Sequence, residues 1–358
     1  AVIFHDRIRT FRELKRDSDA LAQALILDGI QGGEPVGLFC TRGYELIVGL
    51  LGILKAGGAY VPMLPDFPEK RLQYMAKVSS IRRIVYNQDA GGRLPQGFSQ
   101  SFLNLSEAVK SGRAFSGRPD RDGEGLCFIL FTSGSTGQPK GVRIRHRSVS
   151  NLLAVLEEQM AALDGGVLCT TNYIFDIFFT ESLAALAFGK YVVMADEAEM
   201  VLPWKAAALV ERHQVEMFQF TPSRASLFMD NEKFFKAATG ISLAVTAGET
   251  LDMGLVEKFR RAGIHRILNL YGPTEATVYA TMADVTAADR ITIGKVLPNC
   301  RGYILDEEGT LVIPGARGEL YLAGECLAAG YAGREDLTRE RFLPDFLNKK
   351  ERMYRTGD

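Results

Sequence analysis

The chain alternates short, uninterrupted apolar runs with longer stretches whose apolar residues recur at helical spacing. Residues 36–40 form such a run, and residues 45–55 after it show the helical pattern. The same order predicts further strands at residues 83–86, 127–131, 167–171, 191–194, 217–220, 243–246 and 267–270, and helices at residues 68–78, 148–160, 203–213 and 254–262. Uninterrupted apolar strands separated by helices are typical of parallel sheets that are covered on both faces. The pattern therefore predicts an α/β fold, and 358 residues leave room for two such sheets.

Two parts of the chain depart from this alternation. Residues 87–123 are rich in glycine, serine, proline and charge, which predicts a loop-rich excursion with a short helix near residues 103–109. From about residue 291, short strands such as residues 302–305 and 319–323 are separated by turn sequences, which indicates antiparallel structure. We therefore expect paired αβ subdomains with mainly parallel sheets over residues 1–290 and a smaller β-rich subdomain over residues 291–358.

Composition narrows the classes of partner. The formal net charge of −1 gives no basic surplus to bind a nucleic acid backbone. No apolar run reaches the roughly 18–20 residues of a membrane span, and the first residues show no signal-peptide pattern. The five cysteines form no CxxC pair, and their odd number argues against a closed set of disulfides. We therefore expect a cytoplasmic protein that works without a nucleic acid or a membrane.

The segment of residues 131–141, FTSGSTGQPKG, carries the strongest chemical signal. Its glycines let backbone N–H groups approach an anion closely, its hydroxyls donate hydrogen bonds, and Lys140 supplies a point charge. A polyphosphate requires these groups, although a solvated glycine- and serine-rich turn has the same composition. The segment is not a Walker A loop, because Gly141 follows the lysine where that motif has serine or threonine.

Further polar groups follow or interrupt the expected strands. Residues 247–249 and 271–275 come directly after two strands, at the end of a parallel sheet where α/β folds bind ligands. Asp176 is a lone acid within the apolar residues 173–179. A buried carboxylate needs a partner. From the residues alone, a salt bridge or helix cap within the protein is favoured over a bound cationic ligand.

In their order along the chain, these motifs resemble those of the superfamily of adenylate-forming enzymes. That superfamily includes the adenylation domains of nonribosomal peptide synthetases, the acyl-CoA synthetases and firefly luciferase. Residues 131–141 are similar to its signature loop, and further matches are residues 54–62 (LKAGGAYVP), 269–275 (NLYGPTE), 318–321 with 330–331, and 354–358 (YRTGD). The resemblance implies two interlocked αβ subdomains, with ligand sites at the C-terminal ends of their strands, and a smaller subdomain shaped as a distorted β-barrel.

The same resemblance implies that the chain uses ATP and Mg²⁺. Glu275 would hold the metal, Thr274 would touch the α-phosphate, and Asp358 would accept hydrogen bonds from the ribose. Asn269 would face the adenine edge, and the ring would lie between Tyr271 with Gly272 and the backbone of Gly248 and Glu249. The phosphates would be enclosed by Thr132, Ser133, Gly134, Ser135, Thr136, Gly137 and Lys140. Of all these residues, the expected catalytic ones are Thr132, Lys140, Thr274 and Glu275.

Asp176 separates the branches of the superfamily. In peptide-synthetase adenylation domains the matching acid pairs with the α-ammonium group of the substrate, whereas acyl-CoA synthetases and luciferases generally lack it. The resemblance also implies a pocket for the substrate side chain, similar to pockets that accept glycine or another small residue such as alanine. Plain core packing is the alternative for most of its candidates, which are Phe175, Ile177, Thr180, Gln219, Val245, Ala247, Leu270, Val278 and Tyr279.

The implied activity joins an amino acid to AMP from ATP and releases pyrophosphate. The acyl group would then pass to the phosphopantetheine arm of a peptidyl carrier protein domain, in nonribosomal synthesis of a peptide such as an antibiotic. A small helper protein is a further partner that the resemblance admits. The alternatives are an acyl- or aryl-acid CoA ligase and a non-catalytic ligand-binding core.

The end of the sequence departs from the superfamily. Asp358 is the last residue, where the resemblance implies a hinge followed by a mobile C-terminal subdomain with a further lysine. This predicts a fragment that binds ATP and amino acid but adenylates poorly. Smaller departures are residues 63–66, where the local acid is shifted, and Ala329, where a basic residue is common.

Overall fold

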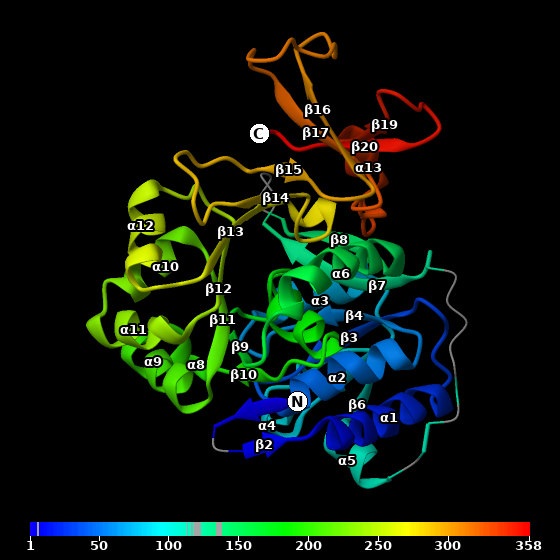
Figure 1. The fold of residues 1–358 in the computed structure, drawn as a ribbon. Helices are drawn as coiled ribbons and strands as arrows, with labels where there is room; N and C mark the ends of the chain where they lie inside the picture. The colour runs from blue at the N-terminus through cyan, green and yellow to red at the C-terminus, as the bar shows by residue number, and fades with distance from the viewer. Residues whose placement is uncertain (6, 113, 116, 118–122, 134–137) are drawn as a thin grey trace.

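A computed structural model describes residues 1–358 except residues 6, 113, 116, 118–122 and 134–137. Within the described residues the strands form three sheets, of nine, seven and four strands. In Figure 1 the two large sheets and their helices make up the body of the molecule, and the four-stranded sheet lies at its C-terminal end, in orange and red.

The nine-stranded sheet is parallel through its centre. Strands β13, β12, β11, β9, β10 and β1 pair in parallel, and β2, β14 and β15 are added antiparallel. In spatial order the strands are β15 (Lys295–Val296), β14 (Thr281–Asp284), β13 (Arg266–Tyr271), β12 (Leu243–Ala247), β11 (Val215–Phe220), β9 (Gly166–Cys169), β10 (Val192–Met194), β1 (Val2–Phe4) and β2 (Arg7–Arg9).

The seven-stranded sheet has the same plan. Its strands β7, β4, β3, β5 and β6 are parallel neighbours, whereas β8 and β18 are added antiparallel. In spatial order the strands are β18 (Gly330–Tyr331), β8 (Lys140–Arg145), β7 (Leu126–Thr132), β4 (Ala59–Pro62), β3 (Pro35–Phe39), β5 (Arg83–Tyr86) and β6 (Ser101–Asn104).

Helices connect the parallel strands, and their starts carry recognisable signals. Thr10 and Glu13 form a capping box at the start of α1, and proline occupies the first turn of α9 and of α10. The α-helices are α1 (Phe11–Leu27), α2 (Tyr44–Lys55), α3 (Glu69–Val78), α4 (Gln88–Gly91), α5 (Leu105–Lys110), α6 (His146–Ala161), α7 (Ala185–Ala187), α8 (Glu197–Val201), α9 (Pro203–Arg212), α10 (Pro222–Met229), α11 (Glu232–Ala237), α12 (Met253–Arg261) and α13 (Glu335–Arg341). A π-helical turn covers Thr180–Ala184, and 3₁₀ turns cover Ala238–Gly240 and Thr274–Ala276.

The predicted α/β fold is confirmed, and each predicted strand and helix has its counterpart within a few residues. Other strands were not predicted, and two of them show why. β8 was missed because only Val142 and Ile144 point into the core, alternating with exposed or half-exposed arginines, so it shows no continuous apolar run. β6 lies in the supposed loop-rich excursion, where a half-exposed edge strand has too little apolar sequence to stand out.

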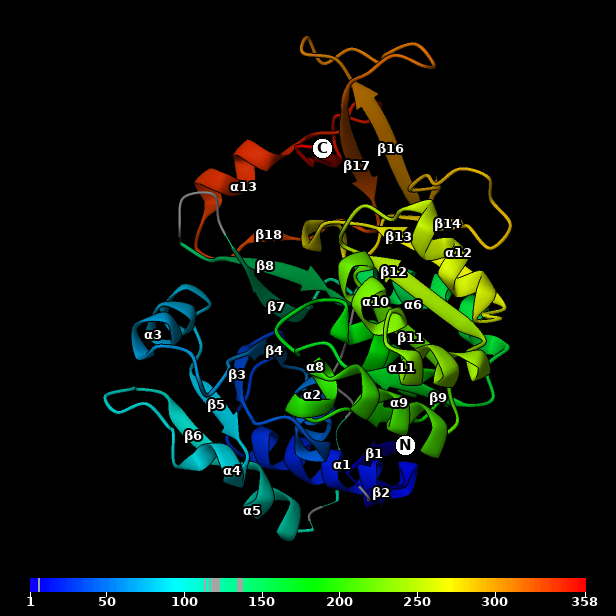
Figure 2. The same ribbon diagram turned by 90° about the vertical axis from the view of Figure 1, so that its left-hand side faces the viewer.

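The four-stranded sheet is antiparallel, as the turn sequences predicted. It consists of β16 (Cys300–Leu305), β17 (Glu319–Gly324), β20 (Arg352–Arg355) and β19 (Phe342–Pro344), and Figure 2 shows β16 and β17 projecting away from the large sheets. Beyond residue 291, β15 and β18 nevertheless join the two large sheets. The boundary between subdomains at residue 291 therefore stays a prediction.

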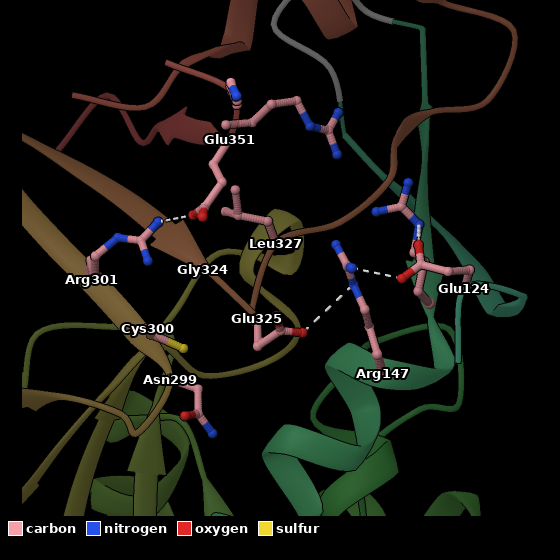
Figure 3. Close-up of a pocket in the computed structure, with 12 residues that line it drawn as sticks. Glu124, Arg147, Asn299, Cys300, Arg301, Gly324, Glu325, Leu327 and Glu351 are labelled. Atoms are coloured by element: carbon pink, nitrogen blue, oxygen red, sulfur yellow. Dashed lines mark hydrogen bonds and ion pairs between the residues drawn. The ribbon is translucent and has the colours of Figure 1, made fainter. Parts of the chain in front are cut away.

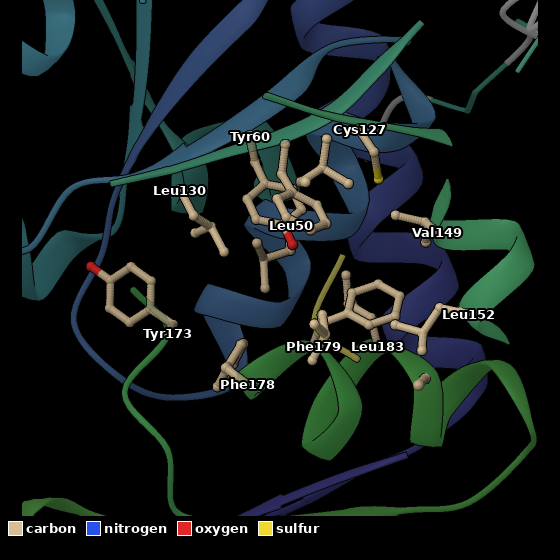
Figure 4. Packing of buried hydrophobic residues seen from close by; sticks show 14 of the residues in the cluster. Leu50, Tyr60, Cys127, Leu130, Val149, Leu152, Tyr173, Phe178, Phe179 and Leu183 are labelled. Carbon is tan, nitrogen blue, oxygen red and sulfur yellow. The ribbon is translucent and has the colours of Figure 1, made fainter. Parts of the chain in front are cut away.

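The main core lies between the two large sheets. Figure 4 shows Tyr60 and Leu130 of the seven-stranded sheet packed toward Phe178, Phe179 and Leu183, which follow β9 of the other sheet. This shared core holds the two sheets together and so fixes the spacing of the loops at their strand ends. All five cysteines carry free thiols, as expected. Among the described helices, none combines the length and the apolar character needed to cross a bilayer.

Candidate functional site

A pocket of about 580 Å³ lies at the C-terminal ends of β12 and β13, and we call it the strand-end pocket. It brings together six of the residues predicted to bind the nucleotide, and it also includes Leu270, which was expected to line the substrate pocket. The lining residues are Gly248, Glu249, Thr250, Leu251, Asn269, Leu270, Tyr271, Gly272, Pro273, Ile291, Thr292, Ile293 and Asp358. Three of these residues, Ile291, Thr292 and Ile293, lie in the connection between β14 and β15. They carry no motif and were not predicted to line a site.

Asp358 is held at this pocket by two contacts. Its carbonyl oxygen accepts a hydrogen bond from the Leu320 amide at 3.0 Å, and its carboxylate accepts one from the Tyr271 hydroxyl at 2.5 Å. Burial, followed by the hydrogen bond to the Asp358 carboxylate, raises the pKa of Tyr271 above its ordinary value. The phenol therefore stays neutral, and the carboxylate of Asp358 remains exposed with free acceptor sites.

The other residues predicted to bind the nucleotide differ in which of their polar groups remain free to bind a ligand. The Asn269 side chain is buried, and its amide nitrogen donates to the carbonyl of Thr292 at 2.9 Å. The Glu249 carboxylate accepts two hydrogen bonds from Ser223, both at 2.9 Å, so it caps α10 and its pKa is lowered. The Glu249 side chain is thus engaged with α10, which agrees with the prediction that the backbone of Gly248 and Glu249 faces the ligand.

A second set of predicted residues forms a continuous line of contacts beside this pocket. The Thr274 hydroxyl donates to the Asp176 carboxylate at 2.6 Å. The adjacent Glu275 is buried and accepts a hydrogen bond from the Tyr331 hydroxyl at 2.6 Å. The ammonium of Lys140 lies 5.3 Å from the centroid of the Tyr331 ring. Lys140 and Glu275 therefore both contact Tyr331, and their common triphosphate site stays a prediction. Tyr331 had entered the sequence argument only as part of a motif.

Asp176 is half-buried and carries no cationic partner among the described ion pairs. Its carboxylate accepts hydrogen bonds from the Thr274 hydroxyl and from the Ile177 amide at 2.8 Å. Burial raises the pKa of Asp176 to about 6, the two hydrogen bonds lower it, and the nearby charge of Glu275 raises it further. Neither the salt bridge nor a helix cap that the residues alone favoured accounts for this acid.

Most candidates for the side-chain pocket are buried, and their gathering around Asp176 stays a prediction. Gln219 and Tyr279 are joined by a hydrogen bond of 2.5 Å, and Gln219 also donates to the carbonyl of Ile177 at 3.2 Å. The Thr180 hydroxyl is buried and has no hydrogen-bond partner among the residues that the structure describes. The exceptions are Phe175, with 58% of its surface exposed, and Ile177, which is half-buried. Val245, Ala247, Leu270 and Val278 are buried as well.

The backbone is strained next to Glu275. Thr277 and Val278 have positive φ angles of 54° and 69°, which β-branched residues rarely adopt. The Thr277 hydroxyl donates to the carbonyl of Cys326 at 2.7 Å, and the Ala328 amide donates to the carbonyl of Glu275 at 2.9 Å. The segment that leads to β18 thus holds Glu275 and Thr277 in place, and strain of this kind gathers at functional sites.

The phosphate loop is described only in part. Thr132 and Lys140 are paired across the β7–β8 hairpin, so the described ends of the loop lie beside each other at the site. Ser133 is exposed. Gly134, Ser135, Thr136 and Gly137 lie outside the described residues, and their assignment stays a prediction.

Glu275 is suited to hold Mg²⁺ together with a bound phosphate ligand. Among the described residues no group of three or more histidine, cysteine or acidic side chains is placed to hold a metal on its own. Mg²⁺ usually takes only one or two protein carboxylates and completes its coordination with phosphate oxygens and water. One buried glutamate beside a lysine fits that pattern.

A second pocket, of about 710 Å³, lies at the other end of β8, and we call it the charged pocket (Figure 3). None of the predicted site residues lines it. Arg147 pairs with Glu124 at 2.6 Å and approaches Glu325 at 3.6 Å, and Arg301 pairs with Glu351. The lining residues are Glu124, Arg145, Arg147, Asn299, Cys300, Arg301, Gly324, Glu325, Leu327, Lys350, Glu351 and Arg352.

Comparison with known proteins bears on this site. The family model for AMP-binding enzymes matches residues 1–332. The chain is 34% identical over 376 residues to the polyketide synthase PksN of Bacillus subtilis, covering all of this chain but only 7% of PksN. Its fold matches AB3403, a four-domain nonribosomal peptide synthetase bound to AMP and glycine, with a TM-score of 0.86 and 31% identity over all of this chain and 26% of that one.

A third similar protein carries a different ligand. The N-terminal subdomain of Klebsiella oxytoca NpsA, in complex with 3-hydroxyanthranilyl-AMSN, matches with a TM-score of 0.86 and 25% identity, over all of this chain and 90% of that one. The fold thus equals that of adenylation N-terminal subdomains. From the family match over residues 1–332 and the identity to relatives such as PksN, the chain belongs to the AMP-binding, adenylate-forming enzymes, as an adenylation domain of the nonribosomal peptide synthetase type.

Proposed function

We propose that this domain activates a small amino acid, glycine or alanine, by joining its carboxylate to AMP from ATP. The observation that carries the proposal is Asp176, a half-buried carboxylate beside the predicted phosphate site with no cationic partner among the described ion pairs. An α-ammonium group would supply the missing charge. A carboxylic acid without an amino group would leave Asp176 unpaired.

The proposed size of the substrate rests on how the side-chain pocket is filled. The bonded pair of Gln219 and Tyr279 occupies space that a larger substrate side chain would need. Both side chains satisfy each other, so displacing either would leave a buried polar group without a partner. AB3403, whose fold this chain shares, has glycine and AMP bound.

The arrangement gives each residue a role in the reaction. An oxygen of the substrate carboxylate attacks the α-phosphorus of ATP, a bond forms between them, and the bond to the β-phosphate oxygen breaks to release pyrophosphate. Asp176 orients the amino acid, and Lys140 offsets negative charge on the leaving pyrophosphate. Asp358, whose carboxylate accepts a hydrogen bond from the Tyr271 hydroxyl, binds the ribose, and Tyr271 flanks the adenine ring. Glu275 would hold Mg²⁺, which would supply positive charge to offset that of the phosphates.

The wider context of the reaction is part of the same proposal. The chain spans only 7% of PksN and 10% of tyrocidine synthase 2 of Brevibacillus parabrevis, another relative. As in a synthetase of that kind, we propose that the aminoacyl adenylate is passed to phosphopantetheine on a carrier protein domain in the cytoplasm. A helper protein belongs to this proposal only as an optional partner.

The main alternative is the activation of an aryl acid. It is favoured by the fold match to NpsA, whose bound ligand carries a 3-hydroxyanthranilyl group. In this chain Gln219 is bonded to Tyr279 in the predicted side-chain pocket, and an aryl ring bound there would have to displace that pair.

Calorimetry with matched ligands tests the proposal. The chain is titrated with glycine, alanine, acetate, propionate and 3-hydroxybenzoate, in the presence of Mg²⁺ and a non-hydrolysable ATP analogue. We expect binding of glycine or alanine and no measurable heat from acetate or propionate. Equal affinity for alanine and propionate would overturn the role of Asp176, and preferential binding of 3-hydroxybenzoate would establish the alternative.

A further inference from the structure

Tyr331 is the residue that connects two parts of the predicted phosphate site. Its side chain is fully buried, and it lies on β18, which pairs with β8 through Tyr331 and Val142. The Tyr331 amide donates to the Thr338 hydroxyl at 3.0 Å. Gly330 before it has a φ of 129°, and a Cβ at that position would lie 2.5 Å from Thr338. The backbone of Tyr331 is therefore fixed from both sides.

The two functional contacts of Tyr331 use different parts of its side chain. The hydroxyl donates to the Glu275 carboxylate at 2.6 Å, a charge-assisted hydrogen bond. The ring face lies 5.3 Å from the Lys140 ammonium, within the range of a cation–π contact. One phenol thus contacts both the predicted metal-holding carboxylate and the predicted phosphate-binding cation.

This arrangement keeps opposite charges apart. A lysine and a glutamate at one site would pair directly if nothing lay between them, and each would then neutralise the other. The described residues show no ion pair between Lys140 and Glu275, and the Tyr331 ring lies against one while its hydroxyl holds the other. A hydrogen bond and a ring contact stabilise both groups without removing either net charge.

We propose that Tyr331 is a positioning residue, which holds Glu275 for the metal and Lys140 for the phosphates while preventing their direct pairing. This rests on the proposed ATP and Mg²⁺ site and adds a residue that acts through the two groups that touch the ligand. A purely structural tyrosine would serve only to pack β18, for example through its edge contact with Phe342 at 5.8 Å between ring centroids.

The hydroxyl is tested with Tyr331→Phe. The readout is binding of a fluorescent, non-hydrolysable ATP analogue over a series of Mg²⁺ concentrations. Because the ring remains against Lys140 and only the hold on Glu275 is lost, we expect the Mg²⁺ concentration for half-maximal binding to rise about tenfold. Affinity at saturating Mg²⁺ should change less than threefold.

The role of the Tyr331 ring is tested with Tyr331→Leu. Tyr303→Phe is the matched control for removing a buried phenol hydroxyl. The leucine variant should bind the analogue about tenfold more weakly even at saturating Mg²⁺, because Lys140 is then free to pair with Glu275. Tyr303 is also a buried phenol whose hydroxyl meets a carboxylate, Asp345 at 3.3 Å, but it lies in the four-stranded sheet. Tyr303→Phe should leave the Mg²⁺ dependence unchanged.

The outcomes separate this proposal from the function on which it rests. If the wild-type chain fails to bind the analogue with Mg²⁺, the proposed function is wrong and the positioning role is wrong with it. If the wild type binds and Tyr331→Phe shifts the Mg²⁺ midpoint less than twofold, only the positioning role is overturned. Should thermal unfolding show that Tyr331→Phe does not fold, Tyr331→His carries the test, since its planar ring and N–H donor should keep the Mg²⁺ midpoint within threefold of wild type. A larger shift in that variant would overturn the role.

Discussion

The strand-end pocket and the charged pocket lie at two sides of the same molecule, and they differ in what their polar groups have left to bind. The charged pocket is larger, about 710 Å³ against about 580 Å³, and has more charged side chains. Arg147 and Arg301, however, already pair with acids of the same pocket, and the Arg352 guanidinium donates to the carbonyls of Ala328 and Ala329, both at 3.1 Å. The Arg352 contacts connect β20 of the four-stranded sheet to the segment before β18, which pairs with β8 of the seven-stranded sheet.

At the strand-end pocket and the adjoining contacts, polar groups are fixed by a hydrogen bond within the protein and keep free capacity to bind a ligand. Asp358 is held by Tyr271 and is exposed, and Asp176 is held by Thr274 but has no cation among the described ion pairs. Unfilled bonding capacity therefore distinguishes the proposed nucleotide pocket from the charged pocket, whereas size and number of charges do not. Each prediction below changes one polar group in one of the two regions.

The largest effect is expected from Asp176→Asn. The variant keeps the size of the side chain and removes the charge that would face an ammonium group in a half-buried site. Loss of one member of such a pair costs about 3 kcal/mol, roughly a 100-fold loss of affinity. Calorimetry of glycine or alanine with the ATP analogue present measures this loss, and binding of the analogue alone should not change. Retention of full amino-acid affinity would show that Asp176 is a structural acid.

A smaller effect is expected from Asp358→Ala, which removes the carboxylate from the nucleotide pocket. Hydrogen bonds to a charged acceptor contribute about 1.5–3 kcal/mol, so nucleotide affinity should fall roughly 30-fold. The matched control is Asp306→Ala, a half-exposed acid that caps a turn next to β16. A fluorescence titration with the ATP analogue compares the two variants. Similar affinities for both would remove Asp358 from the site.

The pH dependence of amino-acid binding follows from Asp176. Its pKa is raised to about 6, mainly by burial, so the unliganded site loses its negative charge as the pH falls through that value. Affinity for glycine or alanine should be constant from about pH 7 to 8 and fall by about tenfold for each pH unit below 6. Calorimetry between pH 5 and 8 would show this, and a flat profile in wild type would contradict it.

The raised pKa of Asp176 also affects the stability of the unliganded protein. Ligand affinity falls at low pH, whereas the contribution of Asp176 to stability is greatest there. The folded-state pKa of Asp176 lies above its unfolded value of 3.8, so the contribution of this group is most favourable at low pH and is lost as the pH rises through about 6. Asp176→Asn should therefore melt at a higher temperature than wild type at pH 7.5, and this difference should disappear near pH 4. Thermal unfolding of both proteins at the two pH values measures it.

Whether a feature of these two pockets could be predicted from the sequence depends on how far apart its residues lie along the chain. The strands β12 and β13 and the residues after them were predicted, because apolar runs followed by polar clusters are local signals. Motif resemblance supplied Glu275 and Asp358. The contact of Tyr331 with Glu275 and Lys140 was not predicted, because it depends on the pairing of β18 with β8 across a long separation in the sequence.

The charged pocket was beyond sequence reasoning for the same reason. Arg301 and Glu351 lie in segments that meet only when the β-rich sheet has formed. The bond between Gln219 and Tyr279 is a related case, since the sequence identified both residues as possible pocket fillers but could not show that they satisfy each other. Patterns identify residue types and local structure, whereas side-chain pairing is decided by tertiary packing.

The smallest effect is expected from Glu351→Gln in the charged pocket. Glu351 and its partner Arg301 have 48% and 37% of their side-chain surfaces exposed, so solvent screens the pair, and its loss should cost at most about 1 kcal/mol of stability. Arg301 keeps its second acid, Asp345, at 3.1 Å, which limits the loss further. Binding of the ATP analogue should stay within twofold of wild type, because this pocket connects parts of the protein and receives no nucleotide. A loss of nucleotide affinity comparable to that of Asp358→Ala, with the melting temperature unchanged, would show that the charged pocket is part of the binding site and that the distinction by unfilled bonding capacity is wrong.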